Sequence, residues 1–265
     1  MKKIIIGGLP RSGSTLLRFI LDASEQIISG PETAFFTRPL SDTLFRINKL
    51  APKIADKLNM DVKNVTYCLI NAHSTLQAFD SLMTCYLKIA EKKTDAWAEK
   101  TPRNCFHYNR ILFESEKNDD ILFISIIRNG LDCITSEFDK SDKRYNERRY
   151  WVSIQQYVDC MRAIYSFNNH DKHFVLKYED LCNAPEKTLH KLSKFLNIEL
   201  NEESLSAFNK DSVTRNKSKV HQPKLTHNIQ DTWINRWRDR EHTQVVNQFL
   251  SNKKAMYFFY KRTEG

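Results

Sequence analysis

The sequence contains no stretch of about 18 apolar residues, the length that a helix needs to cross a bilayer. It shows no secretory signal peptide, because a run with the pattern of a strand begins within its first few residues. Internal repeats, low-complexity tracts and a clear domain linker are also missing. These absences lead us to expect one domain over residues 1–265, located in the cytoplasm and without a membrane segment.

Closely spaced cysteines are lacking as well. The six cysteines stand 17 to 28 residues apart, and no pair has the spacing C-x-x-C. Zinc sites and secreted disulfide frameworks depend on paired or more closely spaced cysteines. We therefore predict apolar, buried thiols in a reducing compartment, with neither a zinc site nor a set of disulfides. The residues concerned are Cys68, Cys85, Cys105, Cys133, Cys160 and Cys182.

Acidic residues are the minority charge. The sequence has 41 Lys and Arg against 32 Asp and Glu, which gives a net charge of +9. The surplus is uneven, because residues 205–265 contain 12 basic and 5 acidic residues. A basic flank suits an anionic ligand, a nucleic acid or an acidic substrate. For most of the individual lysines, a solvated surface is the simpler interpretation.

The N-terminal stretch has the pattern of a buried strand, a glycine-rich loop and a helix. Ile4–Ile6 is apolar, and apolar residues recur at helical spacing from Leu16 to Leu21. Between them, Gly8 to Thr15 matches the phosphate-binding motif G-x-x-x-x-G-K-[ST] at every place but one, where Ser14 replaces Lys. Such a loop directs backbone N–H groups and the positive end of a helix at one point, which suits a phosphate.

The missing lysine indicates which anion the loop binds. In the nucleotide-binding motif this lysine reaches the β- and γ-phosphates of a triphosphate. A loop that lacks it and contains Arg11 predicts a shorter anion. We expect the helix to run from about Gly13 to Ser24 with Ser12 as its N-cap. The alternatives are a plain strand–turn–helix and a degenerate kinase or ATPase loop.

A second candidate is the carboxylate of Glu32, which follows a turn at Gly30-Pro31. Ligands of this fold class bind at the carboxyl ends of the strands, so the turn is expected beside the phosphate loop. A carboxylate there is unfavourable unless it has a purpose, such as taking a proton from an attacking hydroxyl. An equally weighted alternative is a first-turn Glu that complements the dipole of a helix starting at Thr33.

The rest of the chain predicts an α/β fold with a P-loop-type parallel central sheet flanked by helices. Residues 37–93 have helical periodicity and are expected to form an insertion after the first βα unit that shapes an acceptor pocket. Further strands are expected to end at Lys100, Arg128 and Tyr178. The last elements are a basic loop at about 211–240 and a helix at about 244–250.

Two of these strand ends carry cations. Lys100 should face the same crevice as the phosphate loop, although one alternative is a surface lysine. Arg128 is followed by a helix that places Ser136 two turns along, and this pair is suited to grip a second phosphate. The alternative for Arg128 is an arginine at a helix start that binds loop carbonyls.

Taken together, the motifs resemble those of sulfotransferases that use 3′-phosphoadenosine 5′-phosphosulfate (PAPS). Gly8–Thr15 looks like the family's 5′-phosphosulfate loop, and Ile127–Ser136 looks like its 3′-phosphate element. Tyr178-Glu-Asp-Leu181, before a helix that starts at Pro185, is also typical. The turn with Glu32 and the stretch Trp97–Pro102 are closest to the protein-tyrosine and bacterial branches.

The resemblance implies a role for each candidate residue. Glu32 is then the catalytic base, and Arg11 and Lys100 stabilise charge on the sulfuryl group and the leaving phosphate. The C-terminal loop is then expected to complete the nucleotide site through one of four residues, Arg215, Lys217, Ser218 or Lys219. The implied binding residues for PAPS, and for the product PAP, are Pro10, Arg11, Ser12, Gly13, Ser14, Thr15, Arg128, Ser136 and Tyr178.

The resemblance implies no metal and no nucleic-acid partner. It is consistent with the absence of an Asp ending a strand in the manner of the kinases and ATPases. The acceptor stays open. A saccharide or small-molecule hydroxyl is narrowly favoured, with Phe35, Phe36 and Trp97 as candidate stacking residues. The alternatives are a tyrosine in an acidic peptide, and a non-catalytic nucleotide- or nucleic-acid-binding protein that uses the basic tail.

Overall fold

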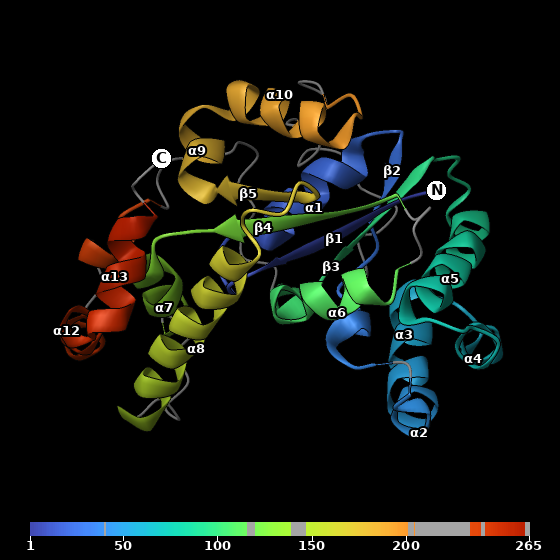
Figure 1. Cartoon of the computed structure of the whole chain (residues 1–265), viewed down its shortest axis with the longest axis horizontal. Helices are drawn as coiled ribbons and strands as arrows, with labels where there is room; N and C mark the ends of the chain where they lie inside the picture. The colour runs from blue at the N-terminus through green and yellow to red at the C-terminus, as the bar shows by residue number, and fades with distance from the viewer. Residues whose placement is uncertain are drawn as a thin grey trace.

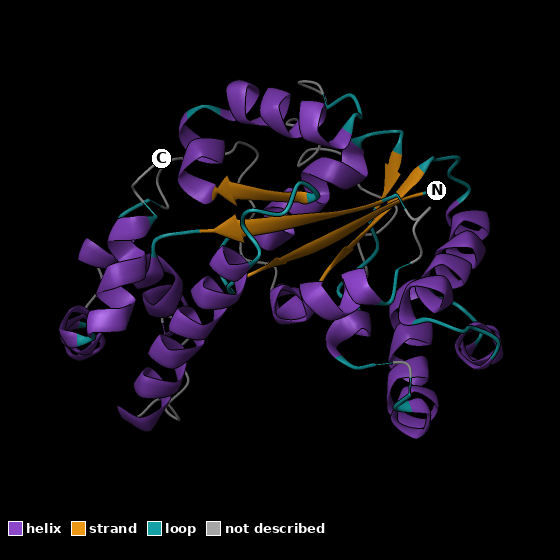
Figure 2. Cartoon of the chain, in the orientation of Figure 1, coloured by secondary structure: helices purple, strands orange, loops and turns teal. Residues whose placement is uncertain are grey.

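Parallel strands form one sheet at the centre of the protein, between two layers of helices (Figures 1 and 2). The computed structural model describes residues 1–39, 41–115, 120–138, 147–200, 204, 234–239 and 242–262. Within these residues the strand order is β2-β3-β1-β4-β5. The strands are β1 (Lys2–Gly8), β2 (Ile27–Ile28), β3 (Ala96–Lys100), β4 (Ile121–Ile127) and β5 (His173–Lys177).

The parallel pairing brings the carboxyl ends of the strands to one edge of the sheet. In the register of β1 and β3, Ile6 stands opposite Lys100, and in that of β1 and β4, Gly8 stands opposite Ile126. Lys100 is therefore the last residue of a strand, and Arg128 and Tyr178 come directly after the ends of β4 and β5. The predicted strand end at Lys100 is confirmed, and the ends predicted at Arg128 and Tyr178 are correct to within one residue.

The helices follow the strands in the order expected for an α/β fold. In the first half of the chain they are α1 (Ser14–Ala23), the 3₁₀ turn η1 (Phe35–Thr37), α2 (Thr43–Phe45), the π-helical turn η2 (Arg46–Leu50), α3 (Ala51–Leu58), α4 (Val62–Ile70), α5 (Thr75–Ala90), η3 (Pro102–His107) and α6 (Tyr108–Phe113). In the second half they are α7 (Gly130–Phe138), α8 (Glu147–Ser166), α9 (Tyr178–Asn183), α10 (Pro185–Leu196), η6 (Arg236–Asp239), α12 (Thr243–Ser251) and α13 (Lys253–Lys261).

Two hydrophobic cores cover the two faces of the sheet. On β1, Ile4 and Ile6 face one core and Ile5 faces the other, as alternation along a strand requires. The smaller core joins the sheet to α1, α9 and α10, and the larger one joins it to α3, α5, α6, α8 and the C-terminal helices. Figure 1 shows α9 and α10 on one side of the sheet and α6 and α8 on the other.

Three expectations about local structure were wrong. Helix α1 begins at Ser14, and its N-cap is Gly13, so Ser12 does not cap it. No helix starts at Thr33, because Ala34 has a left-handed φ of 58° and a short 3₁₀ turn follows. Strand β2 is too short to be recognised from sequence periodicity, and the helical insertion follows it, after the first βα unit as predicted. A further helix, α13, follows the predicted last one.

The predictions about cysteines, metal ions and membrane helices can be compared with the structure. All six thiols are free; five are buried, as predicted, and Cys85 is half-buried. Within the described residues, no group of three or more His, Cys, Asp or Glu side chains is arranged to hold a metal ion. In the same part of the chain, no helix combines the length and apolarity needed to span a membrane.

A buried histidine in the sheet gives the fold a predicted dependence on pH. His173 is the first residue of β5, and its ring has Nδ1 3.0 Å from the Phe167 carbonyl oxygen and Nε2 2.9 Å from Ser125 Oγ on β4. Burial lowers the pKa of His173 from 6.5 to about 4. Because the folded-state pKa is depressed, the stability present above pH 6.5 is lost as the pH falls towards 4.

We predict that this histidine contributes a loss of roughly 3 kcal/mol in the free energy of unfolding over that range. Urea unfolding of wild type and of His173→Gln at several pH values measures it, and the variant should show a flatter profile. His190→Gln, which changes an exposed histidine on α10, is the matched control. Identical profiles for wild type and His173→Gln would contradict the assignment.

Candidate functional site

The loop between β1 and α1 adopts a conformation that few sequences allow. Gly8 and Gly13 have φ values of 148° and 95°, and Arg11 has a φ of 68°. Glycine adopts such values without strain, whereas other residues rarely do. Gly13 is needed for a second reason, since a Cβ there would lie 2.8 Å from Cε2 of Tyr178. The turn therefore packs tightly against the residue that follows β5.

The start of α1 keeps its polar groups available for an anion. No side chain caps the helix, and its first turn contains no acidic residue. Ser12 is fully buried, and its hydroxyl forms no hydrogen bond within the described part of the chain. A buried polar atom without a partner is costly, so its place in a phosphate-type loop fits a bound oxygen. Pro10 and Thr15 are exposed at this loop, and Ser14 is buried at the first position of α1.

Three of the predicted binding residues meet on the β4 side of this loop. Arg11 donates from Nε and Nη2 to Ser136 Oγ, at 3.2 and 3.1 Å. Arg128 donates from Nη1 to the Arg11 carbonyl at 3.0 Å, and its guanidinium lies 4.4 Å from the centre of the Tyr178 ring. Two arginines and a hydroxyl are thus linked through Arg11, and such a set of donors suits a phosphate.

This arrangement refines the expectation for Arg11. The sequence interpretation assigned Arg11 to the sulfuryl group, whereas its side chain bonds to Ser136, within the element expected to bind the second phosphate. The alternative reading of Arg128, that it binds loop carbonyls, is also present in part, because its Nη1 binds one. The two functions are compatible, since the backbone bond orients the guanidinium.

Glu32 and Lys100 form an ion pair on the other side of β1. Lys100 Nζ lies 2.6 Å from Glu32 Oε2. The Lys100 side chain is only 6% exposed, whereas that of Glu32 is 44% exposed. Lys100 is therefore not a surface lysine, and Glu32 is not a helix-capping residue, because no helix begins there. The carboxylate is open to a partner from solvent, while its counter-charge is fixed from within the fold.

The turn that carries Glu32 is held from α1 and α3. Arg18 donates from Nη1 to the carbonyl oxygens of Ser29 and Gly30, at 2.9 and 3.2 Å. Asp22 accepts the Ser29 N–H at 2.8 Å, and Lys57 donates to the Glu32 carbonyl. Burial lowers the pKa of Arg18, which is the cost of fixing this turn with an internal cation.

Glu99 is the site residue that the sequence interpretation missed. Its side chain lies one position before Lys100 in β3 and is almost fully buried. It accepts the Thr33 N–H at 3.3 Å and the hydroxyls of Thr33 and Thr101, each at 2.7 Å. Asn104 Nδ2 donates to its other oxygen at 2.6 Å. The signal in the sequence is a carboxylate inside an otherwise apolar strand, next to the predicted lysine.

The end of the predicted C-terminal loop is anchored close to Arg128. Asp132, in the first turn of α7, accepts the backbone N–H groups of Asn235 and Trp237 at 2.9 and 3.0 Å. The side chain of Asn129 also lies 3.5 Å from that of Asn235. The four candidates in the basic loop, Arg215, Lys217, Ser218 and Lys219, lie outside the described residues.

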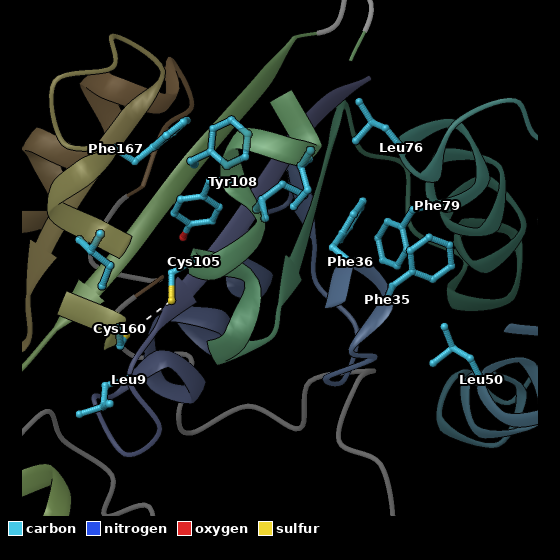
Figure 3. Packing of buried hydrophobic residues seen from close by; sticks show 14 of the residues in the cluster. Leu9, Phe35, Phe36, Leu50, Leu76, Phe79, Cys105, Tyr108, Cys160 and Phe167 are labelled. Carbon is cyan, nitrogen blue, oxygen red and sulfur yellow. Dashed lines mark hydrogen bonds between the residues drawn. The ribbon is translucent and has the colours of Figure 1, made fainter. Parts of the chain in front are cut away.

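The aromatic side chains expected in an acceptor cleft are in the core instead. Phe35, Phe36 and Trp97 are all fully buried. The rings of Phe35 and Phe36 pack against Phe79 of α5, as Figure 3 shows, and Trp97 also contacts Phe79 at 4.8 Å between ring centres. The expectation that they stack on a saccharide was therefore wrong.

Comparison with known proteins decides the family. Residues 3–202 match the model described as "Sulfotransferase family", which is well over half of the chain. The chain belongs to the sulfotransferase family. The glycine loop, the Glu32–Lys100 pair and the Arg128–Ser136 pair all lie within the matched residues.

Among curated members of the family, several similar proteins are protein-tyrosine sulfotransferases. This sulfotransferase-family chain is 29% identical over 213 residues to protein-tyrosine sulfotransferase 1 of Danio rerio, with 76% of this chain and 55% of that protein covered. It is 25% identical over 208 residues to protein-tyrosine sulfotransferase 2 of Gallus gallus, with 75% and 52% covered. The chain spans about half the length of these relatives.

Solved sulfotransferase structures have the same fold. The sulfotransferase domain of an olefin synthase from Synechococcus PCC 7002 superimposes with a TM-score of 0.68, at 20% identity, with 99% of this chain and 94% of that chain covered. A mouse sulfotransferase solved with PAP gives a TM-score of 0.56 at 13% identity, with 99% and 88% covered. The predicted parallel sheet flanked by helices is confirmed.

The loop geometry yields a stability prediction. We expect Gly13→Ala to lower the free energy of unfolding by ~1–3 kcal/mol, because alanine is strained at this φ and its Cβ would press on Tyr178. Urea unfolding measures the loss. Gly30→Ala is the control: its φ is not left-handed and its nearest neighbour, at 3.0 Å, is the flexible end of Leu58. Equal effects of the two changes would contradict the role of the loop conformation.

Proposed function

We propose that this chain transfers a sulfuryl group from PAPS to an acceptor hydroxyl, with Glu32 as the general base. The observation that carries this proposal is the pair of Glu32 and the buried Lys100, 2.6 Å apart, at the strand edge that also carries the glycine loop. The Thr101 N–H donates to the Ile6 carbonyl at 3.2 Å, so the exit of β3 lies against the end of β1.

The residues of the glycine loop and those around it offer hydrogen-bond donors that suit the anionic groups of PAPS. The loop from Pro10 to Thr15 would hold the 5′ end through the Ser12 hydroxyl and backbone N–H groups of residues after Pro10, which itself has no N–H. Arg128 and Ser136 would hold the 3′-phosphate, and Arg11, which bonds Ser136, would lie between the two anions. Tyr178 supports this side by packing on Gly13 and on the Arg128 guanidinium.

The transfer itself needs a base and a cation. The acceptor oxygen forms a bond to sulfur while the bond between sulfur and the 5′-phosphate oxygen breaks, and PAP leaves. Glu32 takes the hydroxyl proton, and Lys100 offsets the negative charge that develops on the sulfuryl and phosphate oxygens. The exposure of Glu32 matters here, because the acceptor must reach the carboxylate from solvent.

For the acceptor, we propose a phenolic hydroxyl, as in a tyrosine side chain. Curated relatives at 25–29% identity are protein-tyrosine sulfotransferases. The net charge of +9 suits an acidic peptide. The aromatic residues that favoured a saccharide are buried in the core, so they give that acceptor no support.

The catalytic role of Glu32 predicts the behaviour of one variant. Glu32→Gln should lower the turnover of labelled PAPS by ~10²–10⁴-fold, because it removes a positioned base, while PAP binding measured by calorimetry stays within about twofold. Glu25→Gln removes the same charge at an exposed position outside the site and should leave turnover unchanged. Wild-type turnover in Glu32→Gln would remove Glu32 from the role.

A competition experiment tests the acceptor. Labelled PAPS is offered together with a glutamate-flanked tyrosine peptide, its phenylalanine counterpart and a hexose. We expect label on the tyrosine peptide alone, since only its phenol combines an acidic flank with a reactive hydroxyl. Label on the hexose in place of the peptide would move the acceptor to the saccharide class.

A further inference from the structure

We propose that Glu99 is a positioning residue that sets the geometry of the Glu32–Lys100 pair. The inference rests on the proposed function, because it assigns a role within the same site. Glu99 touches neither Glu32 nor Lys100 through a hydrogen bond, yet it binds the residue that follows each of them, Thr33 and Thr101. Its carboxylate thereby joins the turn after β2 to the exit of β3.

The direction of each hydrogen bond supports this role. Thr33 Oγ1 accepts the Phe35 N–H at 3.2 Å, and Thr101 Oγ1 accepts the Ala34 N–H at 3.0 Å. The single hydroxyl proton of each threonine is then available for Glu99 Oε1, at 2.7 Å in both cases. One carboxylate oxygen therefore binds both threonine hydroxyls. These hydroxyls in turn hold the backbone N–H groups of Ala34 and Phe35, shortly after Glu32.

The second carboxylate oxygen ties this arrangement to the phosphate loop. Asn104 Nδ2 donates to Glu99 Oε2 at 2.6 Å and to the Ile6 carbonyl at 3.1 Å. Ile6 is two residues before Gly8, where the glycine loop begins. The base, the lysine and the start of the anion loop are thus connected through two buried side chains, those of Glu99 and Asn104.

A purely structural role explains these observations less well. Burial raises the pKa of Glu99, opposed by its hydrogen bonds to Thr33, Asn104 and Thr101, and the negative charge of Glu32 adds to the rise. A buried carboxylate costs stability compared with an apolar side chain of similar size. Its distinctive property is that it only accepts hydrogen bonds, so it serves four donors at once. A glutamine would turn an N–H group towards one of them.

The first test is structural and does not depend on activity. In a crystal structure of Glu99→Gln, the distance between Lys100 Nζ and Glu32 Oε2 should be longer than the 2.6 Å of the wild type, because the amide faces Asn104 Nδ2 as donor against donor. An unchanged Glu32–Lys100 pair in this variant would overturn the proposal. If Glu99→Gln does not fold, the same comparison is made with Thr101→Val, which removes one hydroxyl, and Thr101→Ser, which keeps it.

The second test is kinetic and uses labelled PAPS with the glutamate-flanked tyrosine peptide. Glu99→Gln should lower kcat by about 10- to 100-fold while the KM for PAPS changes by less than about twofold. Thr101→Val should lower kcat in the same sense, and Thr101→Ser should restore it. Ser125→Ala, which removes a buried hydroxyl from β4 away from the pair, should keep wild-type kcat.

A double variant separates positioning from stability. If Glu99 acts through Glu32, adding Glu99→Gln to Glu32→Gln should change the residual rate by less than about twofold. Fully multiplicative losses would overturn the proposal, and so would a wild-type kcat in Glu99→Gln. If the wild type does not consume PAPS, the proposed function is wrong. The crystal structure of Glu99→Gln would still test whether Glu99 positions the Glu32–Lys100 pair.

Discussion

The ion pair between Glu32 and Lys100 depends on where β3 leaves the sheet. Parallel pairing with β1 brings the end of β3 to the edge that carries the glycine loop. Lys100 therefore reaches the site directly from the last position of the strand. The Lys100 side chain is only 6% exposed, so its charge is shielded from solvent and pairs with the carboxylate of Glu32. The turn that presents Glu32 is then fixed by Arg18, Asp22 and Glu99, all of which lie in the core.

The side of β1 that faces β4 carries arginine and hydroxyl side chains. There, Arg11 donates to Ser136, and Arg128 donates to the Arg11 carbonyl, close to the start of α1. Cations arranged in this way favour an anionic ligand. The site therefore has a basic half suited to binding and a paired half suited to proton transfer, with the glycine loop between them. This division matches the chemistry of moving a charged group from a nucleotide to a hydroxyl.

The sequence predicted the parts of this site that stand at the ends of regular elements. Lys100 and Arg128 follow recognisable apolar runs, and strand polarity then places them on a common edge. Other parts depend on tertiary structure that no local pattern shows. The N-cap of α1 is Gly13 and not the predicted Ser12, because the close packing of Tyr178 requires a left-handed glycine at this position. Phe35 and Phe36 are aromatic residues of the kind that line a binding cleft, yet the helical insertion covers them. Glu99 was missed because one of its partners, Thr33, comes from a segment distant in sequence.

We propose that the glycine loop binds a nucleotide with a 3′-phosphate and no γ-phosphate. Calorimetric titration of the chain with PAP and, separately, with ATP tests this preference. Serine in place of the P-loop lysine, together with Arg128 and Ser136, favours PAP, so we predict one PAP bound per chain, at least about tenfold more tightly than ATP. Failure of PAP to bind, or binding of ATP as tight as that of PAP, would show that the loop does not have this preference.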